Sequence, residues 1–111
     1  MNTNYFFEAD HGWQTVGEGI SRQIAGYNDA LMMVKVKFDT GAFGALHAHP
    51  HSQASFVASG VFDVTISGEV QRLGAGDCFF AAPDQEHGVE CIEAGVLVDV
   101  FNPKRDDFLK K

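Results

Sequence analysis

Basic residues, cysteines and long apolar runs are all scarce in this chain of 111 residues. Lysine and arginine total 8 against 15 aspartates and glutamates, so the formal net charge is −7 and nucleic acid is an unfavourable partner. There is neither an apolar run of about 18 residues nor a charged and then apolar leader, which predicts a cytoplasmic protein that does not enter a membrane. The length suits one domain over residues 1–111.

The two cysteines, Cys78 and Cys91, form no Cys-x-x-Cys motif. Their number and spacing do not match a disulfide-dense scaffold, so two reduced, partly buried thiols are expected. A cross-strand disulfide between them stays open.

Helical periodicity is missing as well, because no segment carries an apolar stripe at helical spacing longer than two turns. Short alternating runs punctuated by glycine dominate instead. In residues 31–38, Met32, Val34, Val36 and Phe38 share one face of a half-buried strand.

The same alternation returns in residues 60–66, and Ser67-Gly68 then supplies a hairpin turn before a strand over 69–73. Further short strands are predicted at 78–82, 89–92 and 96–101. Regular short strands with turn glycines predict an all-β fold, an antiparallel barrel or double sheet.

The two ends of the chain differ in composition from its middle. The amino end, MNTNYFFEADHGW, is more aromatic than a free tail should be, so we expect it to pack on the barrel or on a partner chain. The carboxyl end, NPKRDDFLKK, is expected to cover the barrel or to end as a short helix.

Histidines gather in GAFGALHAHPHSQASFVASG, residues 41–60, where His47, His49 and Gln53 are flanked by glycines. A second signal, GDCFFAAPDQEHG, places His87 four residues after a proline. Residues two apart in a strand project to the same face, so His47 and His49 can chelate one ion, and Gln53 has the same parity.

Three imidazoles and one amide are typical of a site for a divalent first-row metal, with room left for water or substrate. The simpler alternative is a set of ordinary polar residues on a hydrated strand face. The glycine flanks and the downstream histidine favour the metal site.

These two motifs resemble those of the cupin superfamily, small β-barrels that hold a metal with two histidines and a carboxylate from the first motif and one histidine from the second. The sequence departs from that pattern at two places. Gln53 stands where the usual glutamate would be, and only three residues separate Pro83 from His87. Cupins perform many chemistries, so this resemblance alone implies the fold, a small antiparallel jelly-roll barrel, and not the substrate.

A narrower resemblance covers nearly the whole chain. The stretches SRQIAGYNDALMMVKVKF, GALHAHPHSQ and HGVECIEAGVLVDVFNPKRDDFL, in this order, are similar to the small cupins of pectin and alginate breakdown often called KdgF. Members of that family open 4,5-unsaturated monouronates to linear keto-uronates, and glutamine is their normal third ligand. The resemblance implies a small anionic sugar as substrate, a homodimer, and one divalent metal among nickel, zinc, cobalt, iron and manganese.

The resemblance also implies a role for particular residues. The metal ligands fall on four side chains: His47, His49, Gln53 and His87. The catalytic aspartate and arginine fall on Asp99 and Arg105, with Phe101 beside them to bind substrate. In this family Asp99 would transfer protons, and Arg105 would hold the substrate carboxylate or stabilise the developing enolate.

From the residues alone, Asp99 and Phe101 share a face of one strand, and Arg105 follows after Asn102-Pro103. These groups would border the metal if that face lies inside the barrel. The alternative from spacing is an ion pair between Asp99 and Arg105 that pins the end of the last strand.

An anionic substrate in a protein of net charge −7 needs a locally positive pocket. Four neutral ligands would leave the full charge of the metal in place, so we predict that Gln53→Glu weakens uronate binding. Two other functions stay open: a different cupin metalloenzyme, such as a dioxygenase or an isomerase, and a non-catalytic cupin that binds a sugar acid.

Four further residues are set aside. His51 is expected in a loop beside the ligands, because Pro50 interrupts the strand, and His11 is expected to be an exposed terminal residue. Whether Arg22 and Lys35 reach the pocket stays open, since the sequence does not say which face points inward.

Overall fold

The computed structural model describes residues 4–110, and these form an antiparallel β-sandwich with very little helix. Eight strands follow one another along the chain: β1 Gln14–Gly17, β2 Ile20–Tyr27, β3 Met32–Phe38, β4 Phe43–His47, β5 Ser52–Ile66, β6 Glu69–Gly74, β7 Cys78–Ala81 and β8 His87–Asn102. A 3-10 turn, η1 Glu8–Asp10, precedes them and a one-turn helix, α1 Asp106–Leu109, follows. The predicted all-β barrel fold is confirmed.

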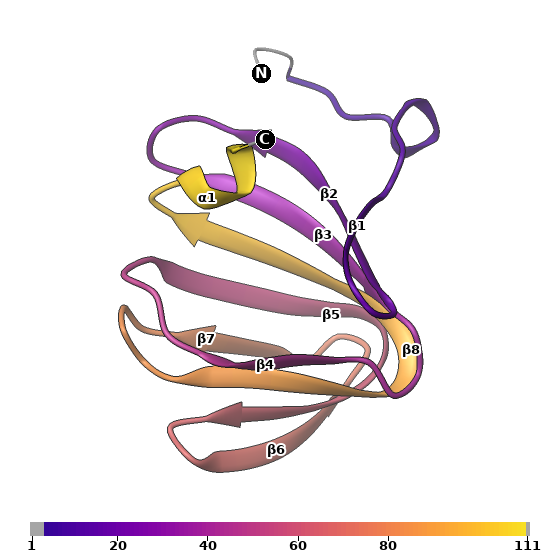
Figure 1. Ribbon diagram of the computed structural model, residues 1–111, viewed down its shortest axis with the longest axis vertical. Helices are drawn as coiled ribbons and strands as arrows, with labels where there is room; N and C mark the ends of the chain where they lie inside the picture. Colours follow the sequence, from indigo (N-terminus) through magenta and orange to yellow (C-terminus); the bar gives the residue numbers. More distant parts are fainter. Residues whose placement is uncertain (1–3, 111) are drawn as a thin grey trace.

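Two long strands, β5 and β8, hold the layers together because each takes part in both (Figure 1). In one layer the order is β1, β2, β3, the second half of β8, the first half of β5, and β7. In the other layer β4, the first half of β8, the second half of β5, and β6 lie side by side. The layers are therefore continuous with one another, and the core lies between them.

The bend in these strands depends on two glycines. Gly60 has a φ of +83°, and a Cβ placed there would lie 2.5 Å from the backbone oxygen of Glu93. A Cβ at Gly95 would lie 2.1 Å from the backbone oxygen of Ser59. No side chain fits where the two strands cross so closely, and the register shifts at this point. The sequence predicted separate strands over 89–92 and 96–101, and that division is wrong because β8 continues through the bend; β5 likewise begins before the predicted start at residue 60.

Other sequence predictions hold in the structure. In β3 the residues Met32, Val34 and Phe38 are buried, as the alternation predicted. The hairpin at Ser67-Gly68 joins β5 to β6 with positive φ at both residues, 49° and 85°, which is the twist that two-residue hairpins favour.

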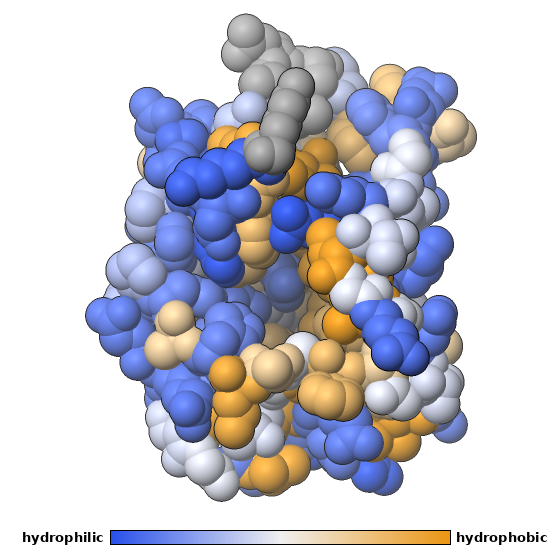
Figure 2. Space-filling model, viewed as in Figure 1, coloured by the Kyte–Doolittle hydropathy of each residue, from blue (hydrophilic) through white to orange (hydrophobic). Residues whose placement is uncertain are grey.

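The interior contains two clusters of buried side chains. The larger one includes Phe38 and Phe62, whose rings meet edge to face with centroids 5.3 Å apart. The smaller one consists of Met32, Val34 and Phe101, against which Phe108 of α1 packs. Figure 2, taken in the same direction as Figure 1, shows that this face is hollowed between the layers, so the core does not fill the barrel.

The two ends of the chain pack against the same sandwich. Trp13 lies under the ammonium groups of Lys35 and Lys37, at 5.3 and 4.3 Å, so the amino-terminal segment covers the outer side of β3. Tyr5 and Phe7 are exposed. The expected short helix at the carboxyl end is α1, and it lies over one end of the hollow.

Both cysteines are free thiols, so no disulfide joins them. Cys91 is buried in the larger core cluster, whereas Cys78 is exposed, which corrects the expectation that both would be partly buried. No helix in residues 4–110 is long and apolar enough to cross a membrane.

Candidate functional site

The pairing of β4 with β8 brings His47 and His87 together. The two residues are directly opposite in the register of these strands, and their ring centroids lie 4.4 Å apart. Strand pairing therefore brings together two histidines that are forty positions apart in the sequence.

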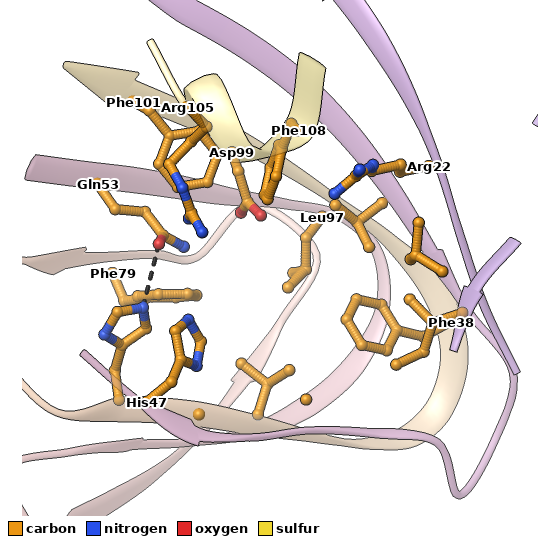
Figure 3. A pocket seen from close by; sticks show the side chains of 17 residues that line it. Arg22, Phe38, His47, Gln53, Phe79, Leu97, Asp99, Phe101, Arg105 and Phe108 are labelled. Atoms are coloured by element: carbon orange, nitrogen blue, oxygen red, sulfur yellow. Dashed lines mark hydrogen bonds between the residues drawn. The ribbon is translucent and has the colours of Figure 1, made fainter. Parts of the chain in front are cut away.

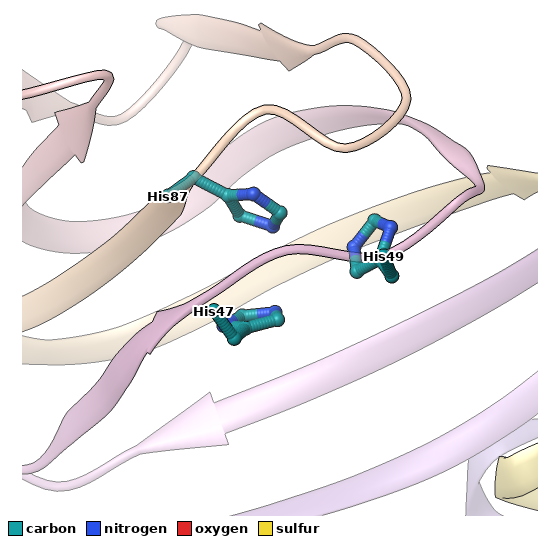
Figure 4. A group of neighbouring side chains, drawn as sticks. All are labelled: His47, His49 and His87. Carbon is teal, nitrogen blue, oxygen red and sulfur yellow. The ribbon is translucent and has the colours of Figure 1, made fainter.

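His49 reaches the same place from a loop. The strand-period argument for His49 is wrong, because β4 ends at His47 and His49 lies in the loop that follows. Its ring is nevertheless buried and lies 4.8 Å from that of His87. The ligand atoms of the three histidines all lie within 4.8 Å of one another, and Figure 4 shows the rings turned toward a common centre.

The backbone favours the same tautomer in all three rings. In each ring Nδ1 is within hydrogen-bond distance of a carbonyl oxygen two residues away: 2.8 Å from His47 to Ala45, 3.0 Å from His49 to His51, and 2.9 Å from His87 to Gln85. A carbonyl oxygen only accepts, so Nδ1 carries the hydrogen and Nε2 presents a lone pair. This arrangement is the one that metal-binding histidines use to fix their orientation.

Gln53 adds a fourth lone pair from β5. Its Oε1 lies 3.0 Å from Nε2 of His49 and 3.1 Å from Nε2 of His87, while its amide nitrogen donates to Ser55 Oγ at 3.0 Å. Oε1 and the two unprotonated Nε2 atoms are all acceptors, so no hydrogen lies between them. A cation is the group that would satisfy this buried cluster.

Burial favours the neutral form of His49 and His87. It lowers the pKa of His49 and of His87, and the neighbouring imidazoles lower both further. Neutral imidazoles with an amide oxygen suit divalent transition metals. The cluster of His47, His49 and His87 in this fold is therefore compatible with a divalent metal site, and the donor set does not select one metal.

A cavity of about 250 Å³ joins this cluster to the other predicted site residues. It is lined by His47, Gln53 and His87 at one end and by Asp99, Phe101 and Arg105 farther along, as Figure 3 shows for the residues that it labels. Pockets that bind drug-sized ligands have volumes of roughly 300–1,000 Å³, and this cavity is smaller. A monosaccharide is therefore a ligand of suitable size.

Asp99 connects the two ends of this cavity. It lies opposite Ser55 in the pairing of β5 with β8, and Ser55 Oγ donates to Asp99 Oδ1 at 2.6 Å. Burial raises the pKa of Asp99 to about 6, although the hydrogen bond from Ser55 and the charge of Arg105 act in the opposite direction. A carboxyl group with a pKa near neutrality can both accept and return a proton.

Arg105 is almost fully buried and pairs with Asp107, not with Asp99. Its Nε and Nη2 donate to the two carboxylate oxygens of Asp107 at 3.0 and 2.8 Å. Its Cζ lies 5.0 Å from the ring centroid of Phe101 and 4.3 Å from that of Phe108. The alternative of an Asp99–Arg105 ion pair is therefore not found, and both groups face the cavity.

Sequence reasoning missed two residues of the site. Ser55 has the parity of Gln53 on β5, and that signal was available in the sequence. No signal in the sequence pointed to Phe108, because its place at the cavity depends on how α1 folds back over the barrel.

The residues left open are now placed. Arg22 lines the cavity, whereas Lys35 lies on the opposite face of the sheet, where it pairs with Glu8. His51 is half-buried beside the cluster and holds His49 through its backbone oxygen. His11 is exposed and stacks on Phe6.

Comparison with known proteins gives consistent matches. A model of the cupin domain matches residues 34–101. The chain is 46% identical, over 95% of its length and 97% of the relative, to the pectin degradation protein KdgF of Dickeya dadantii.

Two solved structures agree closely with this one. An RmlC-like cupin from Shewanella frigidimarina superposes with a TM-score of 0.94 at 43% identity, covering 96% of each chain. The structure of KdgF from a Halomonas species superposes with a TM-score of 0.93 at 40% identity, covering 96% of this chain and 99% of that one.

Proposed function

Because this chain belongs to the cupin family and, within it, to the KdgF-like small cupins, we propose that it opens 4,5-unsaturated monouronates to linear 5-keto-4-deoxyuronates. The observation that carries the proposal is the convergence of four neutral acceptor atoms beside a buried carboxyl group in one small cavity. The substrate would come from pectin or alginate breakdown, and the two sources differ mainly in hydroxyl configuration.

The metal would be held by His47, His49, His87 and Gln53. When bound, a divalent metal supplies a Lewis acid that stabilises negative charge on a sugar oxygen. Since all four ligands are neutral, they would not cancel any of the metal's positive charge, and an anionic substrate would meet that charge in full. This matters because the net charge of the protein is −7.

Asp99 would move the proton in this reaction. The substrate is a cyclic hemiacetal, and loss of the proton on its anomeric hydroxyl to Asp99 forms the aldehyde while the bond from C1 to the ring oxygen breaks. The electron pair of that bond stays on the former ring oxygen as an enolate. Return of the proton to C4 gives the 5-keto product, so the reaction is an isomerisation with no other reactant. A carboxyl group with a pKa of about 6 suits both steps.

The cationic and aromatic groups would position the sugar and balance its charge. Arg105 places a permanent positive charge at the cavity, where the enolate develops, and Phe101 forms a wall beside it. The pairing of Arg105 with Asp107 holds the guanidinium in one orientation. Of the two roles predicted for Arg105, charge stabilisation is the better supported.

The test is an assay of the conjugated double bond of the substrate, whose absorbance disappears on ring opening and tautomerisation. Unsaturated galacturonate and guluronate monomers would be given to metal-loaded protein, to chelated protein and to the Asp99→Asn variant. We expect acceleration only with the metal-loaded wild type. The same rate as the spontaneous reaction with every divalent metal tried would refute the proposal.

The two alternative functions predict different results. A dioxygenase would consume oxygen with its substrate, and an isomerase would act on another small molecule without oxygen. A non-catalytic sugar-acid-binding cupin would bind uronate with no turnover and would keep its function without Asp99.

The homodimer and the cytoplasmic location stay predictions within this proposal. Light scattering of the purified protein would test the first, with an expected mass of twice the 12.1 kDa chain.

A further inference from the structure

Arg22 is a second guanidinium at the cavity, outside the residues that the proposed function uses. It lies on β2 opposite Val36 of β3, and its side chain points to the inner side of the sheet, into the cavity that holds Asp99. Figure 3 shows it at the end of the cavity away from His47 and Gln53.

The two arginines at the cavity differ in their partners. Arg105 uses Nε and Nη2 to hold Asp107. Arg22 donates through Nε to Gln14 Oε1 at a long 3.4 Å and forms no salt bridge within residues 4–110. The guanidinium whose terminal nitrogens stay available for a carboxylate is therefore that of Arg22.

Phe108 fixes Arg22 in place. The ring centroid of Phe108 lies 3.9 Å from Cζ of Arg22 and 4.3 Å from Cζ of Arg105, so one ring contacts two cations. In Figure 3 the Phe108 side chain stands between the two guanidinium groups. This contact orients the Arg22 fork without using its donors.

Partial burial of the Arg22 guanidinium removes water that a bound anion could replace. Burial lowers the pKa of Arg22, and the positive charge of Arg105 lowers it further, although Asp107 acts in the opposite direction. A bound carboxylate would relieve the cost of burial, because its charged hydrogen bonds replace the lost water.

We infer that Arg22 determines specificity by binding the carboxylate of the uronate, while Phe108 holds its guanidinium in position. The inference rests on the proposed function and names the residue that separates uronates from neutral sugars and uronate esters. Arg22 acts on recognition, so its loss should affect KM and not kcat.

The experiment compares the unsaturated monouronate with its methyl ester, using metal-loaded wild type, Arg22→Met and Arg22→Lys. Methionine keeps an unbranched apolar chain against Phe108 and removes the charge. For the acid we expect Arg22→Met to raise KM by about 10- to 100-fold, because this is the usual effect of losing a hydrogen-bonded pair of charged groups. The kcat for the acid should change by less than about threefold. For the ester, KM should stay unchanged, and Arg22→Lys should recover part of the loss on the acid.

Arg72→Met is the matched control, since Arg72 lies outside the cavity and pairs with Asp63 on the exterior. It should behave as wild type with both substrates. An equal loss on acid and ester in Arg22→Met would show a structural role and overturn the inference, as would an unchanged KM for the acid.

Binding of D-galacturonate and its methyl ester, measured by calorimetry, separates this inference from the proposed function. If wild type binds galacturonate without turning over any unsaturated uronate, the proposed function fails. In that case weaker galacturonate binding by Arg22→Met still supports the inference, and binding equal to wild type overturns it. Melting temperature and metal content of each variant show that it is folded and loaded.

Discussion

The two ends of the cavity are opposite in chemistry. At the acceptor end His47, His49, His87 and Gln53 present lone pairs with no hydrogen between them. At the cationic end Arg22, held by Phe108, presents donors and positive charge, and Arg105 lies between Gln53 and Arg22 in Figure 3, contacting the same Phe108 ring. The first end suits a cation and the second suits an anion.

A uronate whose oxygens approach a metal and whose carboxylate approaches a guanidinium would satisfy both ends together. Asp99 lies between Gln53 and Arg22 in Figure 3; Ser55 connects it to Gln53 by hydrogen bonds, and the charge of Arg105 acts on its carboxyl group. The difference between the ends therefore suggests one direction for the substrate in the cavity.

The first prediction removes the group between the two ends. Asp99→Asn keeps the size of the side chain and cannot take up a proton, so turnover should fall by about 10²- to 10⁴-fold, the usual contribution of a general acid–base group. Metal content and uronate binding should change little, because both ends stay intact. Steady-state kinetics with the absorbance assay measures this. Normal turnover in the variant would assign the proton transfer to another group.

A second prediction concerns the stability of the metal-free protein. The fold raises the pKa of Asp99 from 3.8 to about 6, so the protonated carboxyl is favoured and the stability it contributes is lost as the pH rises through 6. Asn does not titrate. In the presence of a chelator, the difference in free energy of unfolding between Asp99→Asn and wild type near pH 4 should therefore reflect only how the two side chains pack. By about pH 8 this difference should have shifted by about 3 kcal/mol in favour of Asp99→Asn.

Urea unfolding of both proteins across that range measures the difference. The groups that act on the carboxyl of Asp99 are Ser55, through its hydrogen bond, and Arg105 and His47, through their charge. Parallel curves of stability against pH would show that Asp99 ionises in the fold as it does in water.

The acceptor end was far easier to predict from sequence than the cationic end. His47, His49 and Gln53 lie within seven positions, and their spacing between glycines was visible at once. The predicted geometry was still partly wrong, since His49 reaches the site from a loop. Its ring is held by a hydrogen bond from Nδ1 to the backbone oxygen of His51, and such a bond cannot be read from the pattern of residue types.

The cationic end combines Arg22 of β2 with Phe108 of α1, which are 86 positions apart in the sequence (108 − 22). Alternation could show that Arg22 shares a face with its neighbours two residues away, but not which face lies inside. The position of Phe108 depends on a four-residue helix that packs back over the barrel. This packing is a tertiary contact that local sequence patterns do not predict. The continuity of β5 and β8 through Gly60 and Gly95 was hidden for a similar reason, because glycine in a strand also signals its end.

A third prediction makes the acceptor end anionic. In Gln53→Glu the new carboxylate would still bind a metal, but it would cancel part of the charge that the substrate meets. Uronate binding should weaken by about tenfold, which corresponds to about 1.4 kcal/mol, with the metal retained. Calorimetry with D-galacturonate on metal-loaded protein measures the effect. Unchanged affinity would mean that only the cationic end sets the electrostatics of binding.

The last prediction tests the link between Asp99 and the acceptor end. Ser55→Ala removes the acceptor for the Gln53 amide and the donor to Asp99, so Oε1 of Gln53 is no longer held toward the histidines. Each lost bond contributes about 0.5–1.5 kcal/mol, so metal affinity should fall by about 3- to 10-fold. Competition with a chelating dye measures that affinity, and Ser59→Ala on the same strand, outside the cavity, is the control. If Ser55→Ala binds metal as wild type does, the histidines alone hold the ion and the orientation of Gln53 matters only to the substrate.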